Sequence, residues 1–366
     1  MTTSQNAEEA FQKALQHFDR GELPAAAEGF ERAIRLDASH QRAHYQLGNV
    51  RREQGRFAEA AAHFEAAVAL LPGHAEAHNN LGVVQQVTGR PYDAIRSYKR
   101  AVELKPALSQ AYLNLGRLLA ELGRSTEAAE WYRRGAAASG EPQVFAHLLA
   151  GLEGRSTAAA PADYVRTTFD AFAPQFDAQL ASLDYRVPEA IARAVARVRH
   201  FAPSSADVLD LGCGTGLSGL ALAPFAGRLA GVDLSPRMLQ QARARGCYHE
   251  LAEADLVAWM RNAPPAQFDL IVAADVLIYL GDLHAVFAEA ARLLRPRGLF
   301  AFSIEECAGA DWRLQESGRY AQSPGYIERL AREQGFVLSL KAQQPIRTPI
   351  VGLLYILSRK DLGESP

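Results

Sequence analysis

The sequence is poor in cysteine and lacks long apolar runs. It contains three cysteines, Cys213, Cys247 and Cys307, which lie far apart and without metal-ligand spacing. An odd and sparse set of this kind is typical of reduced thiols, so neither a disulfide framework nor a metal site is expected. No apolar run approaches the roughly 20 residues that span a bilayer. The first residues, MTTSQNAEEAFQKAL, also lack the basic start and apolar stretch of a signal peptide. We therefore expect a cytoplasmic protein with no membrane partner.

The chain also lacks an excess of charge of either sign. It has 39 Lys and Arg against 41 Asp and Glu, a formal net charge of −2. Binding to nucleic acid without sequence preference needs many contacts between Lys or Arg and phosphates, so no nucleic-acid partner is expected. The hydrophobic fraction of 48% indicates a globular protein with a full core, and the length of 366 residues favours two domains.

A 34-residue repeat is present in the first part of the chain. Three kinds of residue recur at this period: glycines (Gly21, Gly55, Gly89, Gly123), alanines (Ala26, Ala60, Ala94, Ala128) and aromatics (Phe30, Phe64, Tyr98, Tyr132). The pattern resembles the tetratricopeptide repeat (TPR) over about residues 7–140, in four units. The resemblance implies an all-α solenoid of helix pairs over residues 1–140. Small residues would let helices approach closely, and the aromatic would fill the gap between neighbouring units.

Polar residues recur on the first helix of successive repeats. Gln46, Asn80 and Asn114 occupy equivalent positions. Carboxamides can donate to and accept from an extended peptide backbone, so a protein or peptide partner on the inner, concave face is one hypothesis. The other interpretation is that these are ordinary solvated positions. A charged clamp for an acidic C-terminus is not indicated, because Arg42 is followed by Glu76 and Gln110 at the equivalent positions.

The sequence changes character after the repeats. Residues 141–163 are predicted to form a short capping helix and a flexible linker rich in small residues, and a second domain is predicted over 164–366. There, apolar strands alternate with amphipathic helices, which indicates an α/β domain with a parallel sheet. The seven predicted strands are Asp207–Leu211, Leu229–Asp233, Tyr248–Ala252, Leu270–Ala274, Gly298–Ile304, Val337–Ala342 and Gly352–Ser358.

Acidic residues follow the first three of these strands. The segment DVLDLGCGTGLSGLAL (207–222) places Asp210 at a strand end, before a turn formed by Gly212, Gly214 and Gly216. Asp233 follows the second strand and Asp255 the third. The carboxyl ends of parallel strands meet at one crevice. Any one of these acids could be a helix cap, but three together predict a binding site.

This arrangement resembles the Rossmann-like class I methyltransferases that use S-adenosylmethionine (SAM). The resemblance implies that Asp210 accepts from the ammonium group of SAM, with the glycine loop against its methionine and ribose portions. Asp233 would accept from the ribose hydroxyls and Asp255 from the adenine amino group. Beside these acids, Leu234, Met238 and Leu256 are predicted to contact the cofactor. Packing in the core is an equal alternative for Met238.

A dinucleotide is the competing ligand. Gly214, Gly216 and Gly219 spell the GxGxxG fingerprint, and Asp233 lies at a suitable distance to bind a ribose. An anionic diphosphate would, however, sit poorly beside Asp210, whereas the cationic SAM would be favoured there. The sequence therefore favours SAM over NAD.

The fourth strand ends in FDLIVAADVLIYLGDL. Asp275, at its carboxyl end, and Tyr279 are candidates for the reaction site, although Asp275 could instead cap the following helix. The Asp/Asn-Pro-Pro-Tyr/Phe loop of adenine and glutamine N-methyltransferases is missing, which argues against amide and nucleobase-amine acceptors. An oxygen, carbon or amine nucleophile remains, on a small molecule or on a protein recruited by the repeats.

The segment before the sheet resembles the lid helices of small-molecule methyltransferases. Phe169, Phe172 and Phe176 recur there at helical spacing, with Asp170 and Asp177 among them. The pair Tyr185-Arg186 could reach the cofactor carboxylate or an acidic substrate, or could simply pack on the sheet.

Over nearly its whole length the chain resembles a family of predicted TPR-containing methyltransferases. That family often has His where this chain has Gln322, so a general base at this position is not expected here. An adaptor protein with an inactive methyltransferase fold is the alternative function.

Overall fold

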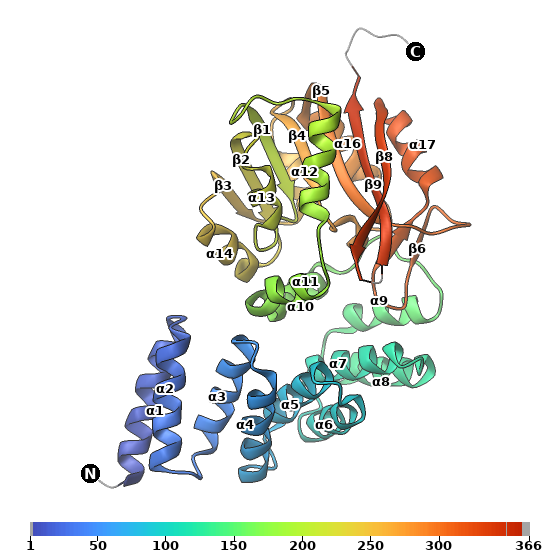
Figure 1. The fold of residues 1–366 in the computed structure, drawn as a ribbon. Helices are drawn as coiled ribbons and strands as arrows, with labels where there is room; N and C mark the ends of the chain where they lie inside the picture. Colours follow the sequence, from blue (N-terminus) through green and yellow to red (C-terminus); the bar gives the residue numbers. More distant parts are fainter. Residues whose placement is uncertain (1–2, 349, 361–366) are drawn as a thin grey trace. The chain divides into compact units, whose positions relative to one another are not determined.

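The computed structural model of the protein describes residues 3–348 and 350–360. Its internal contacts divide the chain into two compact units, residues 1–149 and residues 150–366 (Figure 1). The division falls within the segment 141–163 that the sequence assigns to a cap and linker.

The first unit consists of antiparallel helix pairs. Each pair packs against the next one along the chain, as the TPR resemblance implies. The helices are α1 (Thr3–Asp19), α2 (Leu23–Leu36), α3 (Gln41–Glu53), α4 (Phe57–Leu70), α5 (Ala75–Val87), α6 (Pro91–Leu104), α7 (Ser109–Glu121), α8 (Ser125–Ala138) and α9 (Pro142–Leu152), the last of which runs across the division. The prediction of a helical repeat domain is confirmed.

The repeated glycines of the first unit have two different roles. Gly55 and its equivalents lie in the turns within the pairs at positive φ, +72° for Gly55, so they are turn residues rather than points of close approach. Close approach occurs instead at Gly116 and its equivalents in other pairs. At Gly116 itself, a Cβ would lie 2.1 Å from the ring of Tyr132. The repeated aromatic thus lies over a glycine of its own helix pair. The expectation that small residues allow close approach therefore holds for Gly116 but not for Gly55. The expectation that the aromatic fills the gap between units leaves out its contact within the pair.

The second unit is built on a mostly parallel seven-stranded sheet. Its strands follow the order β3-β2-β1-β4-β5-β9-β8, and only β9 and β8 run antiparallel to their neighbours. They are β1 (Ala206–Leu211), β2 (Ala226–Asp233), β3 (Glu250–Glu253), β4 (Phe268–Ala273), β5 (Leu294–Glu305), β8 (Phe336–Arg347) and β9 (Ile350–Arg359). A small sheet of β6 (Trp312–Leu314) and β7 (Tyr320–Gln322) was not predicted. The seven-stranded Rossmann-like sheet is confirmed.

Helices cover both faces of the sheet and bury an apolar core on each (Figure 1). One core includes α12 (Val187–Val198) and α13 (Leu217–Leu222). The other includes α15 (Leu256–Asn262), α16 (His284–Leu293) and α17 (Pro324–Glu333). The remaining elements are α10 (Ala162–Phe172), the 3-10 turn η1 (Ala173–Gln175), α11 (Phe176–Ser182), α14 (Pro236–Ala244) and the 3-10 turn η2 (Leu277–Tyr279).

The predicted linker is fixed to the second unit rather than free. The backbone of Ala160 donates to the carbonyl of Tyr279 at 2.9 Å, and the carbonyl of Ala158 accepts from Gly281 and Asp282 at 2.8 and 2.9 Å. The side chain of Trp312 donates to the carbonyl of Thr157 at 3.2 Å. The expectation of a flexible connection is therefore wrong for this part of the segment.

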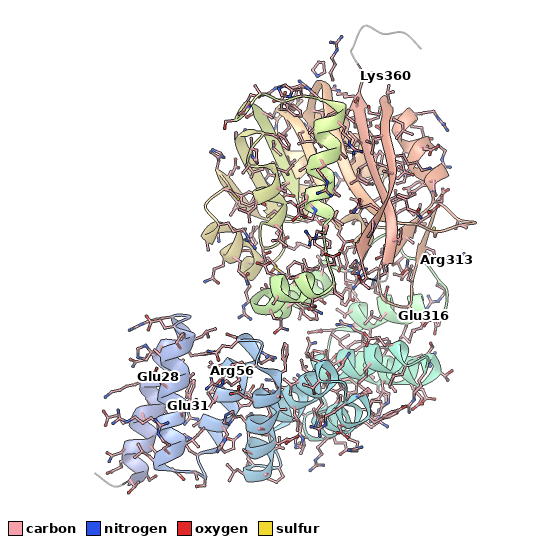
Figure 2. The ribbon with its side chains drawn as sticks, in the orientation of Figure 1. Glu28, Glu31, Arg56, Arg313, Glu316 and Lys360 are labelled. Atoms are coloured by element: carbon pink, nitrogen blue, oxygen red, sulfur yellow. The ribbon has the colours of Figure 1, made fainter. Side chains whose placement is uncertain are left out.

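Charged side chains of both signs project from the surface of each unit, as Glu28 and Arg56 illustrate in the first and Arg313 and Glu316 in the second (Figure 2). No described helix has the length and apolarity needed to cross a membrane. Within residues 3–348 and 350–360, no group of three or more His, Cys, Asp or Glu is arranged to hold a metal ion.

Candidate functional site

The glycine loop joins β1 to α13 through three glycines at positive φ. Gly212, Gly214 and Gly216 have φ of +62°, +54° and +90°. A Cβ at Gly212 would lie 2.4 Å from Val276, so only glycine fits there. At Gly214, by contrast, a Cβ would have no described atom within 4 Å. The loop therefore turns tightly and leaves open space beside Gly214.

Several N–H groups of this loop already have partners within the protein. Gly214 donates to Oδ2 of Asp233 at 2.9 Å, and Gly219 donates to the hydroxyl of Tyr248 at 3.1 Å. Cys213 and Gly216 donate to backbone carbonyls at 3.1 and 2.9 Å. A diphosphate on a Gly-rich loop depends on free N–H groups at the start of a helix. The structure therefore disfavours the dinucleotide interpretation of GxGxxG.

Asp210 is fully buried at the end of β1 and has one unsatisfied oxygen. Its Oδ2 accepts from the Tyr248 hydroxyl at 2.6 Å, whereas its Oδ1 is buried and accepts no hydrogen bond from the described residues. Burial raises the pKa of Asp210 to about 7, although the Tyr248 bond lowers it. A buried acceptor without a donor is costly. An ammonium group such as that of SAM supplies both a donor and a positive charge, so the site fits the predicted cofactor.

Asp233, at the end of β2, is held by the backbone. Its Oδ2 accepts from Gly214 and its Oδ1 from Ser235, at 2.9 and 2.8 Å. Burial raises the pKa of Asp233, and these N–H bonds lower it. Each carboxylate oxygen keeps a second lone pair. The side chain is thus fixed in place with acceptors still available for ribose hydroxyls.

The predicted adenine contacts have a different environment. Asp255 is exposed, and its Oδ1 caps α15 by accepting from Ala258 at 2.9 Å. Its contact with adenine stays a prediction, as do those of the half-buried Leu234 and Leu256. Met238 is completely enclosed, which favours the core-packing interpretation for this residue.

The lid is fastened to the loops that follow β1 and β2. On α10, Oδ1 of Asp170 accepts from the Ser235 hydroxyl at 2.5 Å. On α11, Oδ1 of Asp177 accepts from the Thr215 hydroxyl at 2.5 Å, and its other oxygen pairs with Arg245. The sequence placed both acids in the lid without assigning them this role.

The structure separates the predicted pair Tyr185-Arg186. The Tyr185 side chain lies close enough to Asp210 and Asp275 for both carboxylates to raise the pKa of its hydroxyl, although burial contributes most. Arg186 instead forms an exposed pair with Asp184, with Nε 2.9 Å from Oδ1. Arg186 is therefore not brought into the site, because its partner is a surface carboxylate on its own turn.

Asp275 takes part in a buried ionic cluster at the end of β4. Its Oδ2 accepts from Nη1 of Arg347 at 2.9 Å, and Nη2 of Arg347 pairs with Glu305. Asp275 has a φ of +57°, and the residue that precedes η2 is Val276 rather than Asp275. Burial raises the pKa of Asp275, and Arg347 lowers it. The helix-cap interpretation of Asp275 is therefore wrong.

Tyr279 lies beside this cluster and beneath the lid. Its ring meets the edge of Phe169 from α10, with centroids 5.4 Å apart. Burial raises the pKa of Tyr279 to about 12, so its hydroxyl is protonated at neutral pH. Arg319 also lies here, with Nη1 4.0 Å from Oε1 of Glu305. Arg319, Arg347 and Glu305 were not identified from the sequence.

Gln322 is fully buried on β7 and supports the loop that carries Tyr279. Its Nε2 donates to the carbonyls of Leu277 and Leu280 at 3.1 and 2.7 Å. A carboxamide donates and accepts hydrogen bonds but does not ionise near neutral pH. Its role here is to hold the loop, which agrees with the expectation that this position provides no general base.

Two family profiles match the two parts of the chain. One, described as "Methyltransferase domain", matches residues 208–298. This range begins within β1 and ends within the first half of β5. The other, described as "Tetratricopeptide repeat", matches residues 11–75, 45–107 and 80–142.

Curated relatives match the second part. A methyltransferase-like protein 27 from Homo sapiens is 37% identical over 110 residues, which are 30% of this chain and 45% of that protein. The ubiquinone biosynthesis O-methyltransferase of Thiobacillus denitrificans is 32% identical over 149 residues, 35% of this chain and 63% of the relative. A trans-aconitate 2-methyltransferase from Azoarcus is 43% identical over 103 residues, 27% of this chain and 39% of the relative. The chain thus spans less than two thirds of the length of each of these relatives.

Solved structures resemble single parts of the chain. The protein MamA covers 36% of this chain and 78% of its own, with 25% identity and a TM-score of 0.36. A SAM-dependent methyltransferase from Mesorhizobium loti covers 48% of this chain and all of its own, with 22% identity and a TM-score of 0.38. The profiles thus identify tetratricopeptide repeats within residues 11–142 and a methyltransferase domain within residues 208–298.

Proposed function

We propose that the second unit transfers a methyl group from SAM to an acceptor that the repeats help to recruit. The observation that supports this most directly is Oδ1 of Asp210, a buried acceptor without a partner at the end of β1. It lies beside a glycine loop that has open space at Gly214. A cation with an ammonium donor satisfies this oxygen, and a diphosphate does not.

In this proposal the residues act mainly by positioning. SAM supplies a methyl group that is already activated on a sulfonium. Asp210 and Asp233 orient the methionine and ribose portions of the cofactor from the tips of neighbouring strands. Asp170 and Asp177 keep the lid closed over the same loops, which excludes water.

Asp275 is the proposed base for an acceptor that carries its proton. One of its oxygens is held by Arg347, and the other accepts no hydrogen bond from the described residues. Its raised pKa makes the carboxylate a better proton acceptor than an exposed Asp. The names of two relatives, an O-methyltransferase and a trans-aconitate 2-methyltransferase, refer to acceptors that present oxygen or carboxylate groups. We therefore favour an oxygen nucleophile over nitrogen or carbon.

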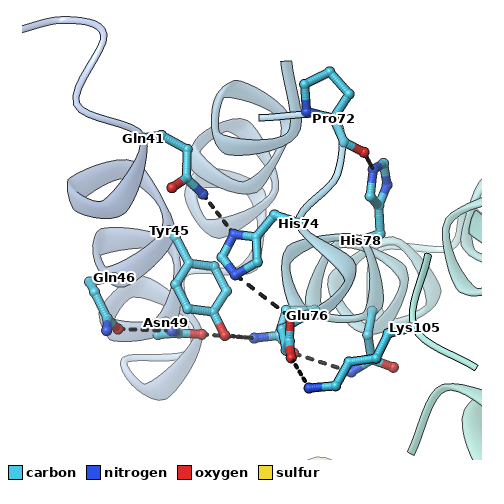
Figure 3. A network of polar contacts seen from close by, with 11 residues as sticks. Gln41, Tyr45, Gln46, Asn49, Pro72, His74, Glu76, His78 and Lys105 are labelled. Atoms are coloured by element: carbon cyan, nitrogen blue, oxygen red, sulfur yellow. Dashed lines mark hydrogen bonds and ion pairs between the residues drawn. The ribbon is translucent and has the colours of Figure 1, made fainter. Parts of the chain in front are cut away.

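The carboxamides of the repeats form one hydrogen-bonded relay, which includes Gln46 and Asn49 (labelled in Figure 3). It runs from Gln110 to Asn114, Asn79, Asn80, Asn49 and Gln46, with donor–acceptor distances of 2.9, 3.0, 3.3, 3.0 and 3.0 Å. The relay links α7, α5 and α3. Each amide has two N–H groups and an oxygen with two lone pairs, so groups remain free to meet an extended backbone.

Two of the positions at which a charged clamp for an acidic C-terminus would lie form ion pairs within the repeats. Arg42 pairs with Glu8, and Glu76 pairs with Lys105 at 2.6 Å (Figure 3). An uncharged peptide segment, read by its backbone, is therefore the proposed partner. This part of the proposal concerns recruitment and is independent of the methyl donor.

The test is methyl transfer from labelled SAM in cell lysate. With the full chain, we expect label in a protein or small-molecule fraction. Asp210→Asn removes the negative charge that would pair with the ammonium group of SAM, and we expect at least a tenfold loss of label, which corresponds to about 1.4 kcal/mol of lost interaction. If Asn80→Ala reduces labelling of protein but not binding of SAM, the repeats recruit the acceptor. Binding of SAM without any labelled product would instead support the adaptor function.

A further inference from the structure

Three glycines of the cofactor site surround one aromatic ring, that of Tyr248. A Cβ at Gly219 would lie 2.5 Å from this side chain, at Gly231 2.8 Å and at Gly216 3.1 Å. Real Cβ atoms essentially never approach to 2.5 or 2.8 Å, and 3.1 Å is a tight contact, so the ring occupies the space that the missing Cβ atoms leave. Gly216 and Gly219 of the GxGxxG sequence therefore make room for Tyr248.

The hydroxyl of Tyr248 has a defined direction. It accepts from the backbone of Gly219 at 3.1 Å and lies 2.6 Å from Oδ2 of Asp210. Because Gly219 donates to the hydroxyl oxygen, the one hydroxyl proton is directed at Asp210. Oδ2 is thus occupied, and Oδ1 is the oxygen left without a partner.

We propose that Tyr248 is a positioning residue for the cofactor, whose hydroxyl holds the Asp210 carboxylate ionised and turned so that Oδ1 meets the ammonium group of SAM. The proposal rests on the proposed function, because it assumes that SAM is the ligand. It adds a residue that touches neither the methyl group nor the acceptor.

The electrostatic surroundings of Asp210 make this bond important. Among the described residues, the titratable groups that interact with Asp210 are Asp233 on β2, Tyr185 before α12, Cys213 in the glycine loop, and Cys247 and Tyr248 before β3. None of these side chains is a cation. Burial and Asp233 raise the pKa of Asp210, whereas the Tyr248 bond lowers it, to a resulting value of about 7. Loss of a hydrogen bond to the charged form raises a carboxyl pKa.

The expected consequence is a change in the pH dependence of cofactor binding. Below the pKa of Asp210, binding of an ammonium ligand must displace a proton, so affinity falls with falling pH. Tyr248→Phe keeps the ring and removes the hydroxyl, which raises that pKa. The variant should therefore bind roughly tenfold more weakly than the wild type at pH 6. The two affinities should converge at pH 9, where Asp210 is ionised in both the variant and the wild type.

The experiment is isothermal titration of the full chain with S-adenosylhomocysteine between pH 6 and pH 9. The ratio of variant to wild-type Kd is the readout, because titration of the ligand itself cancels in the ratio. Tyr326→Phe is the matched control. The Tyr326 hydroxyl likewise accepts from a backbone N–H, that of Leu283 at 2.8 Å, and donates to a carboxylate, that of Asp282 at 3.3 Å.

A ratio that falls from about ten at pH 6 to near one at pH 9, with no such trend for Tyr326→Phe, supports the proposal. A ratio independent of pH overturns it and leaves the proposed function standing. If the wild type binds no S-adenosylhomocysteine, both are overturned. Should Tyr248→Phe fail to fold, site-specific 3-fluorotyrosine at position 248 replaces it. Its more acidic hydroxyl is a stronger donor and should move the midpoint of the wild-type profile to lower pH, and an unmoved midpoint overturns the proposal.

Discussion

The ionic cluster around Asp275 allows a quantitative test of the site. The Arg347 side chain is 9% exposed and bridges Asp275, which is 16% exposed, and Glu305, which is 5% exposed. Arg347→Met keeps most of the apolar volume but removes the charge and the donors. Two buried carboxylates then lose a common partner. Breaking a buried pair in this way costs about 3–5 kcal/mol of unfolding free energy.

The effect should depend on pH, with a sign that follows from Asp275. Burial raises the pKa of Asp275, and Arg347 opposes that rise. In the variant the charge of Arg347 is gone and, of the two cations Arg347 and Arg319 that lower this pKa, only Arg319 remains, so the folded-state pKa lies further above the unfolded value. Such a group favours the folded state at low pH and loses that contribution as the pH rises through the folded pKa. The deficit of Arg347→Met relative to the wild type should therefore shrink on acidification.

The assay is urea unfolding at pH 5.5 and pH 8, with Arg295→Met as the matched control. Arg295 also bridges two carboxylates, those of Asp207 and Asp269, both at 2.6 Å, but its side chain is 40% exposed. Exposed pairs contribute about 1 kcal/mol or less. Equal costs for the two variants, or a deficit that does not shrink at pH 5.5, would refute the argument that this cluster is buried and mutually dependent.

Three further predictions test other parts of the structure. Asp177→Ala removes the carboxylate that holds α11 on the glycine loop. Because a hydrogen bond of about 1 kcal/mol is lost, we expect about fivefold faster release of S-adenosylhomocysteine in stopped-flow measurements. An unchanged rate would mean that the lid does not control release. Gly116→Ala places a Cβ 2.1 Å from the Tyr132 ring and should destabilise the repeats by about 1–3 kcal/mol in calorimetry. Gly73→Ala, with no described atom within 4 Å, should not, and a similar loss from both would count against close packing. Asp255→Ser keeps a helix cap while removing the carboxylate, so weaker binding at an unchanged Tm would support the adenine contact, and unchanged binding would reject it.

The fold was predictable from the sequence because its signals are periodic. Each 34-residue unit repeats its turn glycine and its packed aromatic, and in the second unit apolar strands alternate with amphipathic helices. The loop after β1 carried its own signal, since Asp210 and the three glycines are adjacent in sequence. The carboxylate at Asp233 could be placed beside them because parallel strands end at one edge.

Contacts between distant segments could not be predicted in the same way. Arg347 meets Asp275 only because β8 and β9 form an antiparallel hairpin beside β5, and nothing in the spacing of the two residues indicates this. Tyr248 was assigned to a strand on its apolar character, but β3 begins at Glu250. Its side chain is thereby free to turn beneath the glycine loop. The linker was expected to be flexible because small residues are common in flexible segments, yet its backbone groups pair with the loop of Tyr279.

We propose above all that the site at the tips of β1 and β2 binds a sulfonium nucleoside. The most direct test is isothermal titration of the full chain with S-adenosylhomocysteine and, separately, with NADH. We predict binding of S-adenosylhomocysteine at one site, weakened by Asp210→Asn, and no binding of NADH. Tighter binding of NADH than of S-adenosylhomocysteine would contradict the account.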